Sequence, residues 1–194
     1  MIEGSEAREH LAMVDRIVER TSTRLNVGAE YFIVWGLVSA IMSLSWQLIS
    51  DHRAPVASIW IGWIAAAFAV GFSIWRGRSA REQRVTFLDR EFLAVLKVAM
   101  GVTFFTFIIE IFGPNLFGAI GLGAIWTFAA SIVLFYIAAH GNRRARGGGI
   151  ILLLSLLIAN LRPEYAGYTL SAGMLVGYAG FGAVEMLAVS RAHE

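Results

Sequence analysis

Six long runs of apolar, charge-poor residues are the feature that most constrains this chain of 194 residues. A helix needs about 20 such residues to cross the roughly 30 Å hydrocarbon core of a bilayer. Composition agrees, because 57% of the residues are hydrophobic and only 15% are charged, whereas soluble domains average roughly 45–50% and 25%. The chain is therefore predicted to be an all-α, polytopic integral membrane protein. Its six transmembrane helices are expected at about residues 31–50, 55–75, 92–112, 116–139, 147–161 and 165–190.

Residues 1–28 precede these runs and predict a cytoplasmic amphipathic helix, whereas residues 29–194 form one transmembrane bundle. Leu11, Val14 and Val18 recur at spacings of three and four, which places them on one stripe of a helix. Arginines recur every four residues on the opposite face. Opposed faces favour docking of residues 5–25 on a cytoplasmic protein partner, with binding to the membrane surface as the alternative.

The distribution of basic residues predicts the orientation of the bundle. With six crossings, Arg53 and Arg162 lie on one side and Lys97 lies within a span, so the other 13 of the 16 basic residues lie on the side of the termini. Basic residues accumulate in cytoplasmic loops of membrane proteins. We therefore expect a protein of the cell inner (plasma) membrane with both termini in the cytoplasm.

Two ionisable residues inside the spans predict an ion pair. Lys97 lies six residues in from Glu91, and Glu185 lies six residues in from Arg191, at the cytoplasmic ends of their spans. Six residues of helix rise about 9 Å, so the two side chains have opposite charge at similar depth. We expect Lys97 and Glu185 to pair, either to fix the helix register or as part of a proton or ion pathway.

A polar and aromatic cluster at the outer ends of the third to sixth spans is a candidate solute pocket. It comprises Glu110, Asn115, Trp126, Asn160, Arg162, Glu164, Tyr165 and Tyr168. An aromatic belt at the membrane interface is the alternative interpretation. The short fifth run, 147–161, would cover only about 22 Å as a helix. It either leaves water access at one end or is completed by residues of the adjoining loop.

Glycine spacing points to close helix contacts. Gly173 and Gly177 form a GxxxG pair in the last span, and such small residues let helix backbones approach each other in lipid. We favour packing within the chain, with a homodimer through Gly173 and Gly177 as the alternative.

Several classes of chemistry are disfavoured. The chain has no cysteine, which excludes disulfides, thiolate metal sites and iron–sulfur clusters. Its four histidines lie at or outside the ends of the apolar runs, and no HExxH, GxSxG or Walker sequence occurs. We expect no cofactor, no metal and no catalytic residue. The arginine-glycine stretch 143–149 is explained by membrane topology, so we expect no nucleic-acid partner.

In size, number of spans and position of the termini, the chain resembles the substrate-binding components of energy-coupling-factor vitamin transporters. The resemblance is one of outline and carries no residue over. Our leading hypothesis is a non-enzymatic membrane protein that binds or conducts a small solute or ion. The alternative is a non-catalytic regulatory or scaffold protein whose N-terminal helix docks a cytoplasmic partner.

Overall fold

The computed structural model describes residues 28–80, 87–112 and 118–191, and every regular element in these ranges is a helix. Five long helices come first: α2 (Ala29–Ser50), α3 (Ile59–Ala80), α4 (Phe87–Phe112), α5 (Gly118–Ala139) and α6 (Arg143–Leu161). A last rod follows, made of α7 (Ala166–Gly173), the π-helical segment η3 (Met174–Ala179) and α8 (Gly180–Arg191). Short 3-10 turns, η1 (Val56–Ser58) and η2 (Pro163–Tyr165), precede α3 and α7. The all-α prediction is confirmed, whereas the helix predicted before Gly28 lies outside the described residues.

Four helical stretches in the described ranges are long and apolar enough to cross a membrane. They are Ala29–Ser50, Val56–Arg78, Arg143–Leu161 and Pro163–Ala188. Shorter apolar stretches, Ala94–Thr106 and Gly123–Ala139, lie in α4 and α5. The helices thus suggest a membrane protein by length and composition, and the count of six crossings stays a prediction.

Helix α6 is longer than the 15 residues expected from the charges around the fifth run. It begins at Arg143, because the side-chain oxygen of Asn142 accepts hydrogen bonds from the backbone N–H groups of Arg144 and Ala145 at 3.1 and 3.4 Å. Such a cap satisfies donors that the first turn leaves without a helical partner. The 19 residues of α6 rise about 28 Å, close to the core thickness of a bilayer. Loop residues therefore complete this helix.

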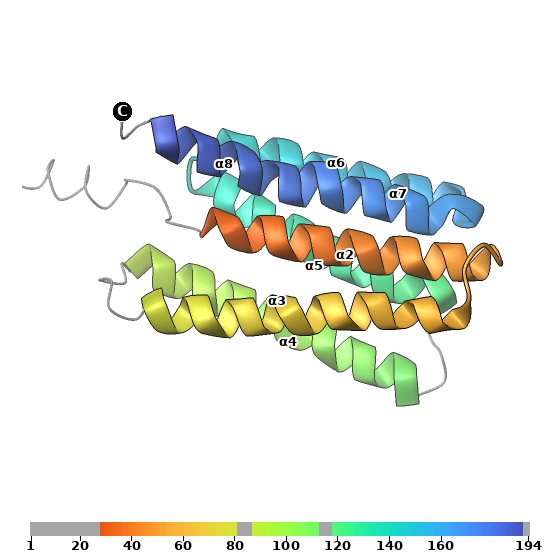
Figure 1. The fold of residues 1–194 in the computed structure, drawn as a ribbon. Helices are drawn as coiled ribbons and strands as arrows, with labels where there is room; N and C mark the ends of the chain where they lie inside the picture. Colours follow the sequence, from red (N-terminus) through yellow and green to blue (C-terminus); the bar gives the residue numbers. More distant parts are fainter. Residues whose placement is uncertain (1–27, 81–86, 113–117, 192–194) are drawn as a thin grey trace, which may run out of the picture.

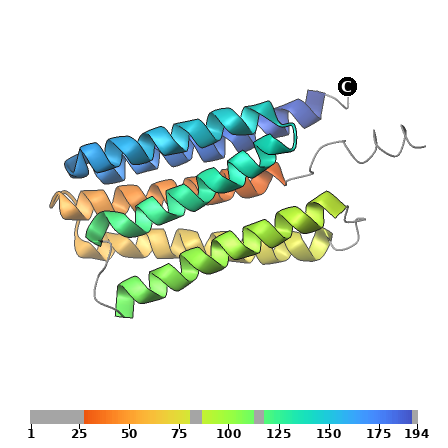
Figure 2. The same cartoon turned by 180° about the vertical axis from the view of Figure 1, so that it is seen from behind.

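The helices form one bundle with α2 at its centre. Figure 1 shows α2 running between α3 and the rod formed by α7, η3 and α8, and it contacts all of them. Helices α5 and α6 pack against each other, and α6 also packs along the rod. Helix α4 packs against α5 and lies at the edge of the bundle, as Figure 2 shows from behind.

The core lies between α2, α5, α6 and the last rod. Leu134, Leu152 and Met174 are almost fully buried there. The ring of Phe32 on α2 lies 4.9 Å from the ring of Tyr178 and 5.1 Å from that of Phe181, measured between centroids. These contacts join the start of the described chain to its end.

Glycines allow the close approach of α6 and the last rod. A Cβ atom at Gly148 would lie 2.5 Å from the carbonyl oxygen of Gly177, and a Cβ atom at Gly177 would lie 2.8 Å from the carbonyl oxygen of Gly148. Gly173 is packed against the side chain of Ser155 on α6. The predicted GxxxG pair thus makes its contacts within the chain. Because Gly173 and Gly177 are both buried, they offer no exposed surface for the alternative homodimer.

Helices α3 and α4 differ from the other helices because little of their surface is covered by neighbouring helices. Their exposed apolar side chains include Trp60, Ile64, Phe68, Trp75, Val98, Phe104 and Phe105. In α3, only Gly62 and Ala69 are buried among the residues whose side chains are described. Such an apolar exterior is suited to acyl chains, which are as apolar as these side chains.

Candidate functional site

A chain of hydrogen bonds crosses the middle of the bundle and joins α5, α2 and α3. The indole N–H of Trp126 donates to the hydroxyl of Ser39 at 2.7 Å, and that hydroxyl donates to the backbone carbonyl of Trp35 at 2.6 Å. The indole N–H of Trp35 in turn donates to the hydroxyl of Ser73 at 3.1 Å. Trp126, predicted to belong to the outer cluster, therefore contacts the middle of α2. Because each of these donors has a partner, the chain holds helices together and leaves no donor for a ligand.

At the end of the bundle where α2 turns into α3, the buried amide of Gln47 ties α2 to α7. Its Nε2 atom donates to Asp51 Oδ1 and to the carbonyl oxygen of Glu164, both at 2.9 Å, and its Oε1 atom accepts from the N–H of Gly167 at 2.8 Å. The side chain is only 7% exposed, so these bonds replace lost hydration. Gln47 was not among the predicted site residues, although an amide inside an apolar run is itself a sign of a buried partner.

The carboxylate of Asp51 completes this cluster outside the spans. The hydroxyl of Tyr168 on α7 donates to Asp51 Oδ2 at 2.8 Å. The hydrogen bonds from Tyr168 and then Gln47 hold the pKa of Asp51 below its usual value, because both bonds favour the ionised carboxylate. Asp51, Gln47 and Tyr168 thus fasten the turn after α2 to the last rod.

The remaining residues of the predicted outer cluster do not converge within the described part of the chain. Arg162 lies 3.5 Å from Glu164 in an exposed ion pair, and the amide of Asn160 donates to the carbonyl of Leu156 in its own helix. Tyr165 is exposed. Asn115 and the side chain of Glu110 lie outside the described residues. The structure brings the backbone carbonyl of Glu164 to Gln47 and the hydroxyl of Tyr168 to Asp51, and the pocket stays a prediction.

Glu185 has a different partner from the one predicted. Its carboxylate lies 3.3 Å from the guanidinium of Arg144 on α6. Lys97 is exposed on α4 and forms no ion pair with another described residue. The reason is the order of the helices, since α4 packs against α5 whereas α6 packs against α8 and the rest of the last rod. In the sequence, the position of Arg144 indicated only the orientation of the bundle.

The arginines gather at one end of the bundle, as their sequence positions predict. Helices α2 and α6 begin at this end, and α3 and α8 finish there (Figure 1). Arg76 of α3 pairs with Glu30 of α2 at 2.6 Å, and Arg144 pairs with Glu185. The arginines at this end whose side chains are described are Arg76, Arg78, Arg143, Arg144, Arg146 and Arg191. Arg53 and Arg162 lie at the opposite end.

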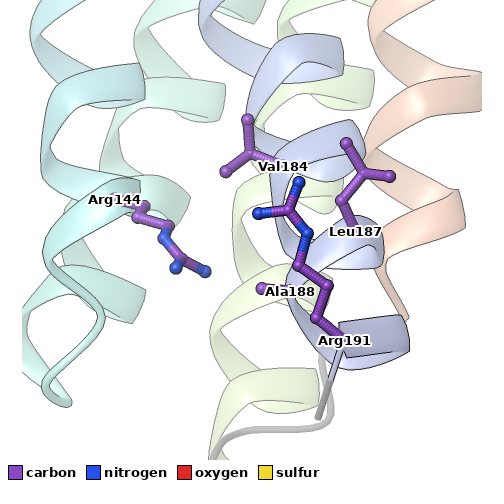
Figure 3. Close-up of a pocket in the computed structure, with 5 residues that line it drawn as sticks. All are labelled: Arg144, Val184, Leu187, Ala188 and Arg191. Atoms are coloured by element: carbon purple, nitrogen blue, oxygen red, sulfur yellow. The ribbon is translucent and has the colours of Figure 1, made fainter. Parts of the chain in front are cut away.

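A hollow of about 280 Å³ lies between α6 and α8 at this basic end. It is lined by Arg144, Val184, Leu187, Ala188 and Arg191. Figure 3 shows Arg144 reaching from α6 toward α8, while the side chain of Arg191 runs back along α8 toward Val184. The guanidinium group of Arg191 makes no hydrogen bond or ion pair with any other residue that the structure describes. Among the described residues, the hollow thus has two guanidinium groups, one of which is paired with the carboxylate of Glu185. The excess positive charge can bind an anion.

A second hollow and the histidines offer less chemistry. About 400 Å³ of space lies on α3 beside Phe68, Gly71, Phe72 and Trp75, which are apolar or aromatic. Within the described ranges, no group of three or more His, Asp or Glu side chains could hold a metal ion.

Comparisons of the chain with protein-family models, curated proteins and solved structures gave no match.

Proposed function

We propose that this chain is a non-enzymatic protein that crosses the plasma membrane six times, with its basic end in the cytoplasm. The gathering of arginines at one end of the bundle supports this orientation, because basic residues are retained on the cytoplasmic side. The helices at all six expected positions and the apolar exterior of α3 and α4 support the membrane placement. Both termini then lie in the cytoplasm.

The absence of cysteine from the chain makes this topology directly testable. A single cysteine is introduced as Ala57→Cys, Arg78→Cys or His140→Cys, and intact cells are treated with a membrane-impermeant maleimide. Ala57→Cys should react in intact cells, whereas Arg78→Cys and His140→Cys should react only after permeabilisation. Reaction of Arg78→Cys and His140→Cys from opposite sides would contradict six crossings, because both α4 and α5 lie between these positions.

The function that the described residues support best is binding of a small anionic solute or ion at the basic end. The hollow between α6 and α8 carries this proposal, since Arg144 and Arg191 both line it and, among the described residues, the only carboxylate that pairs with either of them is that of Glu185, which pairs with Arg144. Dense packing around Leu152 and Met174 favours binding at the end of the bundle over conduction along its interior. Binding sites commonly join an apolar wall to a few convergent polar groups.

Binding of inorganic phosphate to the purified full-length chain tests this function. The double variant Arg144→Gln and Arg191→Gln should weaken phosphate binding by about tenfold or more, because it removes two charge-assisted contacts. The matched control is Arg53→Gln with Arg162→Gln, which removes the same charge from the opposite end. Equal phosphate affinity in the two double variants would contradict the site.

A regulatory or scaffold function is the second candidate. Helix α2 begins at the basic end, so residues 5–25 connect to the bundle on the side that we place in the cytoplasm. Deletion of residues 1–25 should then abolish capture of a cytoplasmic partner while leaving phosphate binding unchanged. Unaltered partner capture by the truncated chain would rule out docking through this segment.

A further inference from the structure

The hollow between α6 and α8 lies at the depth where two candidate spans end. One span begins at Arg143 and the other finishes at Ala188. Arg144 and Arg191 therefore flank the boundary between the apolar helix surface and the polar end of the bundle. In a bilayer this boundary is the level of the lipid headgroups.

The lining of the hollow has a polar half and an apolar half. The guanidinium groups of Arg144 and Arg191 form the polar half. Val184 and Leu187 form an apolar wall on the outer face of α8, where they are 47% and 59% exposed. A free inorganic anion would use only the guanidinium groups, whereas a lipid would use both halves.

We propose that this hollow binds the phosphate of an anionic phospholipid from the cytoplasmic leaflet. The inference rests on the proposed membrane orientation and names the ligand class of the proposed anion site. The guanidinium groups of Arg144 and Arg191 bind the phosphate oxygens, a geometry that suits the planar donors of arginine. The first part of an acyl chain lies along Val184 and Leu187. Basic pockets between membrane helices on the cytoplasmic side provide this combination of contacts.

The charge of the site matches a phosphodiester. Glu185 lies 3.3 Å from Arg144 and offsets one of the two positive charges. Among the described residues that line the hollow, one positive charge remains, and it complements the one negative charge of a phosphatidylglycerol headgroup. A zwitterionic phosphatidylcholine headgroup carries no net charge to offset, so the site should discriminate between these two lipids.

Native mass spectrometry of the full-length chain in detergent, titrated with phosphatidylglycerol or phosphatidylcholine, tests the proposal. The first variant is Arg191→Gln, because Arg191 is exposed and its removal leaves the Arg144 and Glu185 pair intact. Its affinity for phosphatidylglycerol should fall by about fivefold to tenfold, and its affinity for phosphatidylcholine should not change. Arg162→Gln at the opposite end is the matched control and should retain both affinities.

A second variant, Leu187→Ser, separates a lipid from a free anion. It should weaken binding of phosphatidylglycerol but leave binding of inorganic phosphate unchanged, because phosphate does not reach the apolar wall. Circular dichroism of both variants checks that the helices are retained.

Each result has a definite consequence. Equal retention of phosphatidylglycerol by Arg191→Gln and Arg162→Gln would overturn the lipid site. Phosphate binding that depends on Arg191, together with no effect of Leu187→Ser on the lipid, would also overturn it and leave the proposed solute function standing. Lipid binding that depends on Arg191 and Leu187, without measurable phosphate binding, would support the lipid site and contradict the solute function.

Discussion

Two regions of this bundle both contain helices apolar enough to cross a membrane, and they differ sharply in how they are packed. One region is the block formed by α2, α5, α6 and the last rod, and the other is α3. In the last rod, 50% of the most apolar 18-residue stretch is buried inside the protein, whereas in α3 only 11% of the corresponding stretch is buried. Both stretches are nevertheless apolar enough to cross a membrane. Hydropathy therefore identifies a helix that can lie in lipid and does not show which helices face protein.

Residue size accounts for the difference better than hydropathy does. The block is joined by small residues, such as Gly36 against Ala179 and Gly148 against Gly177. Small residues let helix backbones approach closely, and the resulting van der Waals packing is one of the sources of helix association in lipid. Helix α3 presents Trp60 and Phe68 outward and is joined to α2 by the hydrogen bond from Trp35 to Ser73. We therefore expect substitutions in the block to destabilise the protein far more than matched substitutions on α3.

The largest expected loss of stability comes from truncating a buried side chain, and it distinguishes the two regions. Leu152→Ala removes a side chain that is fully buried between α6 and its neighbours, and it should lower the free energy of unfolding by about 2–5 kcal/mol because it leaves a cavity. Ile64→Ala on α3 is the matched control, since Ile64 is 69% exposed and lipid can fill the space. Thermal unfolding in detergent measures both. Similar losses in the two variants would show that α3 is packed as tightly as the block.

A smaller loss of stability is expected when a methyl group is added to a glycine at a contact between helices. Gly148→Ala places a Cβ atom against the backbone of Gly177, so α6 and the last rod must move apart, at a cost of about 1–3 kcal/mol. Gly71→Ala on α3 has no atom within 4 Å of the added carbon and should be neutral or stabilising by up to about 1 kcal/mol, because alanine favours helix. Stabilities measured by unfolding in mixed micelles check the difference. An unchanged stability of Gly148→Ala would contradict the glycine contact.

The smallest expected change in stability concerns Asp51, in the turn between α2 and α3 that joins the two regions. The hydrogen bonds from Tyr168 and Gln47 lower the pKa of Asp51, so their contribution to stability is complete above the ordinary aspartate pKa and declines as the pH falls below about 4. The unfolding temperature should therefore drop slightly at acid pH. Asp51→Asn and Tyr168→Phe should each reduce this acid-dependent decrease. An acid response identical to that of the unmodified chain would show that Asp51 does not contribute to it.

The sequence predicted those features that depend on one helix at a time. The position of each helix follows from its apolar run, and the gathering of Arg76, Arg144 and Arg191 at one end follows from where each run stops. The start of α6 was predicted less well, because the cap by Asn142 extends the helix through arginines that charge alone assigned to a loop.

Apart from the packing of Gly173 and Gly177 within the chain, the features that depend on two helices were not predicted. Charge and depth suggested Lys97 as the partner of Glu185, but the structure places Arg144 beside it. Trp126 was assigned to the outer cluster, but its indole N–H meets Ser39 in the middle of the bundle. Both differences come from neighbour order and helix rotation, which hydropathy does not encode.

The sequence by itself determined that this chain is helical, suited to lipid, and basic at one end, because these properties arise from the order of residues along each segment. The tertiary structure alone decided that Gln47 meets Gly167, that α6 lies against the last rod, and that Arg144 and Arg191 share a hollow. The physical reason is that an apolar face can be covered equally well by lipid or by protein. The choice between them is made by the fit of small residues on neighbouring helices, which exists only once those helices have come together.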